Sequence, residues 1–195
     1  MAWGKNGTPN TLTVAGSPEI TDLTANTFNQ FLINGVAPSS TAAQDITFSG
    51  NTNSVYARRT SLNGAADSTG VSEASVGIGI GVSNNHFMMG YVCAIVGEEK
   101  LIILQYAEAN TAGAGTAPNR REYVAKFVPS PDATISAIKL DMAGNTYAVD
   151  SNLSVLGSDL TPAAGTSATI SDGSIFYETD TNKAYVLYNG SWTEL

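Results

Sequence analysis

The chain has 195 residues, 43% of them hydrophobic, which suits one ordinary domain or one domain with a small appendage. Nine basic residues against seventeen acidic ones give a formal net charge of −8, which argues against general nucleic-acid binding because that function needs a Lys/Arg footprint. No apolar run approaches the roughly eighteen residues of a membrane span, and the first ten residues hold no apolar signal core. We therefore expect synthesis in a cytosol and no membrane span.

The first segment, residues 1–10, contains Gly, Asn, Thr and Pro around one large aromatic residue, Trp3. This composition predicts an extended N-terminal arm. An aromatic side chain in such an arm docks either on its own domain or on a neighbouring molecule. Both alternatives stay open, and Trp3 is a candidate assembly residue.

Short apolar segments separated by Gly, Asn and Pro turns follow, in a pattern typical of β-strands. Residues 28–33 fit a strand or a helical turn about equally, and the surrounding pattern favours the strand. The polar segment 65–75 predicts a surface loop. Residues 76–82 carry Gly at alternate positions, which predicts a strand with a bare face that another element approaches closely. The other strands expected in this half are 12–14, 46–48 and 55–62.

The centre of the fold is predicted at residues 87–106, where two apolar runs flank a polar tip at 97–100. Their length, their β-branched residues and the Gly-containing turn predict the two strands of a hairpin. A buried helix is the competing interpretation, and Gly90 and Gly97 argue against it. Because both sides of the pattern are apolar, we expect this hairpin to be buried on both faces.

After the hairpin, a long loop at 111–119 precedes the last strands of the main domain. These are expected at 121–128, 135–140, 147–149 and 153–156. At least nine short strands and no convincing amphipathic helix predict an all-β protein. We expect residues 11–157 to form an antiparallel β-sandwich of the jelly-roll kind.

Composition changes at Gly157, and residues 158–173 are predicted to form a linker. The last segment, 174–195, predicts a small C-terminal β-hairpin appendage, which is too small to be stable alone. Its aromatic side chains must pack on the main domain, on a copy of the chain or on a partner. They are the remaining candidate assembly residues: Phe176, Tyr177, Tyr185, Tyr188 and Trp192.

Side chains suited to catalysis or metal binding are scarce, because the chain has one His, His86, and one Cys, Cys93. Cys93 lies in the most apolar run, where a buried thiol is expected rather than a nucleophile. We expect His86 on the surface or in a loop. One His and one Cys cannot build a zinc site without several carboxylates, and residues 150–161 lack the Gly and the final Glu of a calcium loop. The sequence therefore predicts no catalytic, cofactor or metal site and a protein that is not an enzyme.

Two stretches carry a resemblance to known proteins. The tail resembles a short module of tailed-bacteriophage structural proteins through Gly173, Phe176–Tyr177, Thr179–Thr181, Tyr185 and Gly190–Trp192. The segments 55–67, 97–105 and 110–127 are similar to uncharacterised proteins from marine viral sequence.

These resemblances imply a non-enzymatic virion structural protein, such as a capsid decoration, head-fibre or tail-fibre subunit, made in the host cytoplasm. The implied partners are copies of the chain, which would form a trimer, and other virion proteins such as capsid or tail subunits. Two other classes stay open. One is a carbohydrate-binding β-sandwich that binds a host-surface glycan through Tyr185, Tyr188 or Trp192, and the other is a non-viral surface-filament subunit.

Overall fold

In the computed structural model of the chain, the described residues form antiparallel sheets and no helix, which confirms the all-β prediction. The structure describes residues 3–25, 27–36, 43–79, 84–109, 113–129, 134–158, 173–178, 183–189 and 191–195. Two compact units divide the chain, one over residues 1–160 and the other over residues 161–195.

A nine-stranded sheet forms the larger layer of the first unit, in the order β1-β13-β4-β9-β10-β11-β6-β7, with β2 also paired to β13. Its strands are β1 (Gly4–Lys5), β2 (Asn10–Thr11), β4 (Phe28–Gly35), β6 (Tyr56–Leu62), β7 (Ser68–Glu73), β9 (His86–Cys93), β10 (Lys100–Glu108), β11 (Asn119–Phe127) and β13 (Asn152–Ser158). The predicted central hairpin is β9 and β10, and β10 lies between β9 and β11.

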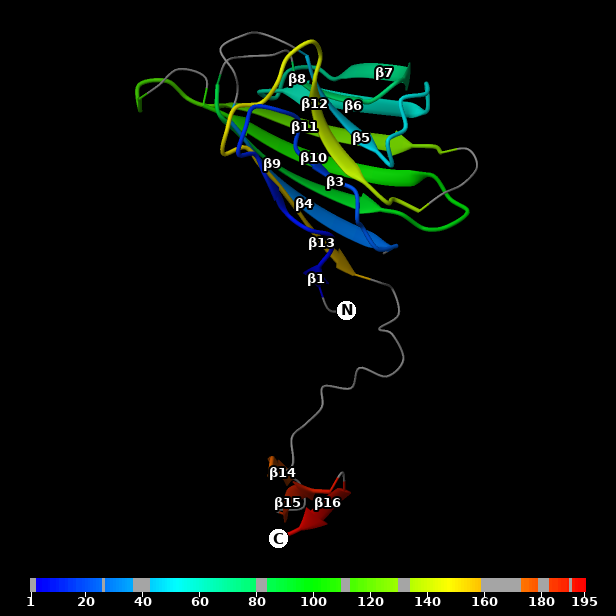
Figure 1. The fold of residues 1–195 in the computed structure, drawn as a ribbon, viewed down its shortest axis with the longest axis vertical. Coiled ribbons are helices and arrows are strands. Elements are labelled where there is room, and N and C mark those ends of the chain that lie inside the picture. Colours follow the sequence, from blue (N-terminus) through cyan, green and yellow to red (C-terminus); the bar gives the residue numbers. More distant parts are fainter. Residues whose placement is uncertain are drawn as a thin grey trace. The chain divides into compact units, whose positions relative to one another are not determined.

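A four-stranded sheet forms the smaller layer, in the order β3-β12-β5-β8. Its strands are β3 (Glu19–Ile20), β5 (Gln44–Phe48), β8 (Val76–Gly79) and β12 (Ile138–Met142). In Figure 1 these strands lie across the larger sheet, and one cluster of buried side chains joins the two layers.

Aromatic rings tie the two sheets together inside this cluster. Phe48 of the smaller sheet lies between Phe31 and Phe127 of the larger one, at ring-centroid distances of 6.2 and 6.0 Å. Tyr56 stacks on Phe127 at 4.8 Å. Its hydroxyl accepts a hydrogen bond from the Phe48 amide at 3.0 Å and donates to the Asn51 carbonyl at 3.0 Å. The shared core therefore contains a tyrosine whose polar end is satisfied at its edge.

The N-terminal arm docks on its own unit. Strands β1 and β2 pair with β13, and the side chain of Asn6, between them, is buried. The Asn6 amide donates to Asn29 Oδ1 at 2.8 Å, and its carbonyl oxygen accepts from the Thr24 amide at 2.8 Å. Hydrogen bonds between polar side chains thus anchor the segment that its composition predicted to be an extended arm. The alternation of apolar residues along a strand does not reveal such bonds.

Two predictions of local structure were wrong. Residues 68–73 of the expected surface loop form the edge strand β7, which the Arg58–Glu73 ion pair ties to β6 at 2.8 Å. The C-terminal module holds three strands instead of a hairpin, namely β14 (Ile175–Glu178), β15 (Lys183–Tyr188) and β16 (Ser191–Glu194). Asn189 at φ 47° allows the tight turn that brings β16 back onto β15. The predicted linker lies outside the described residues except for its ends, of which Ser158 belongs to β13.

Candidate functional site

The central hairpin is buried on one face only, which corrects the prediction that both faces are covered. Along β10, buried and exposed residues alternate strictly: Ile102 is 1% exposed and Ile103 is 55% exposed. The smaller sheet covers the face that carries Ile102. The other face is apolar in sequence yet has no covering element among the described residues of the first unit.

The uncovered face gathers large apolar side chains from three neighbouring strands. The pairing register places Tyr91 of β9 opposite Ile103 of β10, and Ile103 opposite Val124 of β11. Cys93 and Leu101 form the adjacent row. We call the following exposed residues the apolar face: Phe87, Tyr91, Leu101, Ile103 and Val124.

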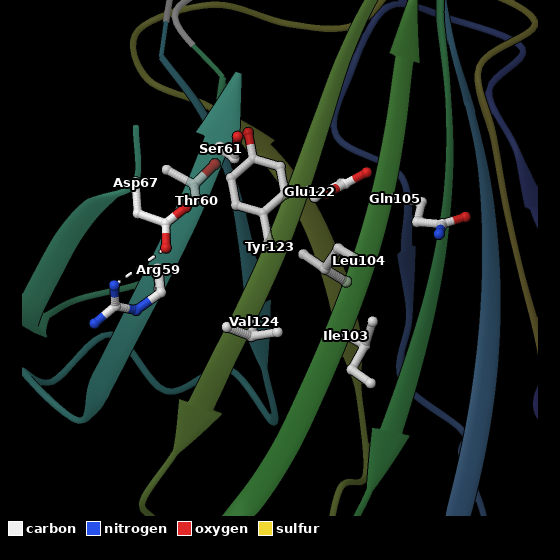
Figure 2. A pocket seen from close by; sticks show the side chains of 10 residues that line it. All are labelled: Arg59, Thr60, Ser61, Asp67, Ile103, Leu104, Gln105, Glu122, Tyr123 and Val124. Carbon is white, nitrogen blue, oxygen red and sulfur yellow. Dashed lines mark hydrogen bonds and ion pairs between the residues drawn. The ribbon is translucent and has the colours of Figure 1, made fainter. Parts of the chain in front are cut away.

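Several hollows shape this face, and two of them border its central residues. Figure 2 shows the first, where Ile103 and Val124 lie on adjacent strands beside the ion pair between Arg59 and Asp67. The second hollow, of about 290 Å³, is lined by side chains that include Trp3, Phe28 and Leu101. Trp3 therefore borders the apolar face, and its side chain is 44% exposed.

The charges around the apolar face cancel. They form three ion pairs: Arg59–Asp67 at 3.1 Å, Lys126–Glu99 at 2.9 Å and Arg120–Glu122 at 3.9 Å. These pairs use three of the nine basic and three of the seventeen acidic residues, so the residues outside them carry the whole net charge of −8. The apolar face is thus the neutral part of an acidic protein.

The C-terminal module brings three of the five candidate aromatic residues together. The ring centroid of Phe176 lies 6.2 Å from that of Tyr185 and 6.1 Å from that of Trp192. The strand register puts Tyr177 and Tyr188 on the opposite face, where both are exposed. The module therefore presents aromatic side chains on both faces, and Trp3 belongs to the other unit.

His86 is buried, which corrects its expected place on the surface or in a loop. As the first residue of β9 it points into the core, where its ring lies 5.2 Å from Tyr106 and 5.8 Å from Tyr147. Its strand partner is Gly35, and the imidazole lies over the space that a side chain would fill there. Burial lowers the pKa of His86 to about 4, and the nearby Asn84 backbone offsets only part of this shift.

Cys93 is half-buried and lines the same hollow as Trp3, so the predicted burial of its thiol is only partial. The described residues contain no cluster of three or more His, Cys, Asp or Glu side chains that could hold a metal ion. Within those same residues, no helix could cross a bilayer.

The sequence analysis did not predict the apolar face, although it identified the apolar residues of the hairpin that form most of it. An apolar run on the outside of a sheet has the same alternating pattern as one on the inside, so periodicity cannot separate them. Comparison of the chain with protein-family models, curated proteins and solved structures found no match.

Proposed function

We propose that the protein is a non-enzymatic structural subunit of a virion, and that copies of it associate through the apolar face. The observation that carries this proposal is the row of exposed Tyr91, Ile103 and Val124 at the centre of a large sheet. The solvent-facing side of an antiparallel sheet is ordinarily polar. A contiguous exposed apolar patch on a protein surface marks an interaction site.

A second copy of the chain is the partner that fits this face best. The ion pairs around it leave no net charge, whereas the rest of the chain is strongly acidic. Two acidic molecules repel each other least where both surfaces are neutral. Copies arranged around a closed symmetry axis can all direct this face inward, and the phage resemblance favours three copies.

The C-terminal module supports attachment to a larger particle. Its residues from Gly173 to Trp192 carry the resemblance to tailed-phage structural proteins, and aromatic side chains are exposed on both of its faces. Such a small sheet gains stability by packing against another surface. We propose capsid or tail subunits as that surface, with the protein as a capsid decoration, head-fibre or tail-fibre subunit in the virion.

The fold that we propose for the first unit suits this structural role. The shared core between the nine-stranded and four-stranded sheets supports a β-sandwich of the jelly-roll kind over residues 11–157. In such an architecture a rigid pair of sheets presents an outer face without needing a catalytic cleft.

Purified virus particles provide the test of this proposal. Full-length protein should be found in purified virions by mass spectrometry, and electron microscopy should place it in symmetric copies on the head or the tail. A variant ending at residue 160 should stay folded but no longer dock on particles that lack the native protein. Absence from purified particles, or equal docking by the truncated variant, would contradict the proposal.

A further inference from the structure

The apolar face has a hollow at one end of strand β9, which we call the Cys93 hollow. It is the hollow of about 290 Å³ that Trp3 also lines. In the strand register, Cys93 lies between Phe28 of β4 and Leu101 of β10. The short side chain of Cys93 thus has a longer one on each side, which leaves a gap above it.

The chemistry of the Cys93 hollow favours an apolar occupant. No charged residue lines it, and its lining includes Tyr91 and Ile103 of the apolar face. Burial of an apolar group against such side chains is favourable, whereas burial of an unpaired charge there is costly. The hollow therefore suits an aromatic or aliphatic side chain from outside.

Phe87, near the other end of β9, has the opposite shape. Its register neighbours are Asn34 of β4 and Ala107 of β10, which are both shorter than Phe and uncharged. The Phe87 ring stands above these neighbours and is 52% exposed. It can therefore enter a hollow on another molecule without burying a charge from either register neighbour.

The other residues of the apolar face fit the hollow less well. Among the five, only Phe87 and Val124 lie outside its lining. Val124 lies opposite Arg59 in the register, and the Arg59 guanidinium forms the ion pair with Asp67. Insertion of Val124 would press this ion pair against an apolar surface, and its desolvation opposes such a contact.

Phe87 cannot fill the Cys93 hollow of its own copy. Phe87 and Cys93 lie six residues apart in the same strand, which is about 20 Å at 3.3 Å per residue. The strand pairs with a neighbour on each side and holds this separation. A second copy of the chain must supply the ring.

We propose that Phe87 of one copy fills the Cys93 hollow of the next copy and is the strongest contact between them. This inference rests on the proposed association through the apolar face and names the contact that holds it. Each copy offers one phenyl ring and one hollow, so an assembly that closes on itself uses all of them. In an assembly of three, each copy inserts its ring into the next.

Disulfide trapping in the full-length protein tests this contact, because Cys93 is the one cysteine of the sequence. Under mild oxidation, Phe87→Cys should form a disulfide between position 87 of one copy and Cys93 of another, detected by peptide mass spectrometry. The same two positions cannot pair within one copy, since a disulfide needs Cα atoms within about 7 Å of each other. Val124→Cys is the matched control on the same face and should form no bond to Cys93.

Sedimentation velocity measures how much the contact contributes. Aromatic side chains that fill a desolvated pocket dominate the affinity of many interfaces, so Phe87→Ala should weaken association at least tenfold. Circular dichroism should show that this variant stays folded, because the side chain is half exposed. Phe176→Ala removes a phenylalanine of almost equal exposure from the C-terminal module and should leave association unchanged.

Absence of the disulfide between positions 87 and 93, or wild-type association of Phe87→Ala, would overturn this inference. Loss of association in Phe176→Ala would assign the hollow to the module and overturn it too. If Ile103→Asp still abolishes the oligomer in those cases, association through the apolar face stands and only the Phe87 contact fails. A monomeric wild-type protein would contradict both.

Discussion

Gly90 shows how a single residue specifies the packing of two neighbouring strands in the larger sheet. It lies in β9 opposite Phe31 of β4, and a Cβ added there would come within 2.1 Å of the Phe31 ring. The buried ring occupies the space above the bare backbone, which is the kind of close approach that a strand glycine indicates. Gly90→Ala should therefore lower the free energy of unfolding by about 1–3 kcal/mol, the usual cost of overpacking.

Urea unfolding of Gly90→Ala beside Gly115→Ala measures this effect. A Cβ at Gly115 meets nothing within 4 Å, so the control should stay within about 0.5 kcal/mol of the wild type. Wild-type stability of Gly90→Ala would show that Phe31 does not lie over the glycine.

The buried side chain of Lys100 holds the tip of the central hairpin through hydrogen bonds to its backbone. Its side chain is fully buried, and Nζ donates to the carbonyls of Ile95 at 2.7 Å and Glu98 at 2.8 Å. Lys100→Met should lose about 1–3 kcal/mol of unfolding free energy because these charge-assisted hydrogen bonds disappear. Lys126→Met is the matched control, since it breaks only the exposed pair with Glu99 and should cost less than about 1 kcal/mol. Equal melting temperatures for the two variants would refute a structural role for the buried ammonium.

His86 makes stability depend on pH. Its pKa is about 4 in the folded protein, against 6.5 for an unperturbed histidine. Between these values the unfolded chain binds more protons, so stability falls as the pH drops from 6.5 towards 4, by about 3 kcal/mol in all. In His86→Phe, which keeps a ring between Tyr106 and Tyr147, this part of the decline should vanish from denaturant midpoints measured across that range. An unchanged pH profile in the variant would mean that His86 is not buried in its neutral form.

At the scale of the strands, Ile102 and Ile103 separate the two faces of the hairpin. Ile102→Asp places a charge in the shared core and should prevent folding. Ile103→Asp places it on the apolar face and should leave a folded, soluble protein, because that side chain is already half exposed. Circular dichroism and melting curves of the two variants decide between one-sided and two-sided burial. Failure of both variants to fold would restore the two-sided interpretation.

The strands could be predicted from the sequence wherever a run of apolar residues is bounded by turn residues. The hairpin of β9 and β10, the strand β4 and the run that forms β13 were predicted on that basis. The edge strand β7 was not, because an edge that is held by ion pairs to β6 has the composition of a loop. Docking of residues 3–10 depends on the buried side chain of Asn6, which the alternation of apolar residues does not reveal.

The candidate site was less predictable than the fold. The aromatic residues of the tail could be selected from their composition, and three of them do cluster. The apolar face could not, because the sequence shows that Leu101 and Ile103 are apolar but not which strand pairs or layers leave them uncovered. The buried position of His86 depends on which strand ends meet between the sheets, which is a property of the topology.

At the scale of the whole molecule, the chain combines an acidic surface, an apolar face bordered by ion pairs and a C-terminal module rich in aromatic side chains. We propose a role in assembly for each of them. In this proposal the acidic surface limits non-specific association, the apolar face brings copies together, and the module supplies a second contact surface.

Sedimentation velocity of the full-length protein tests the central claim most directly, because self-association through the apolar face must show in the mass of the species. Wild-type protein should sediment as a closed oligomer and Ile103→Asp as a folded monomer. Val14→Asp, which makes the same change at a side chain 72% exposed outside the apolar face, should keep the wild-type distribution. A wild-type protein that stays monomeric at high concentration, or an Ile103→Asp variant that keeps the oligomer, would contradict the account.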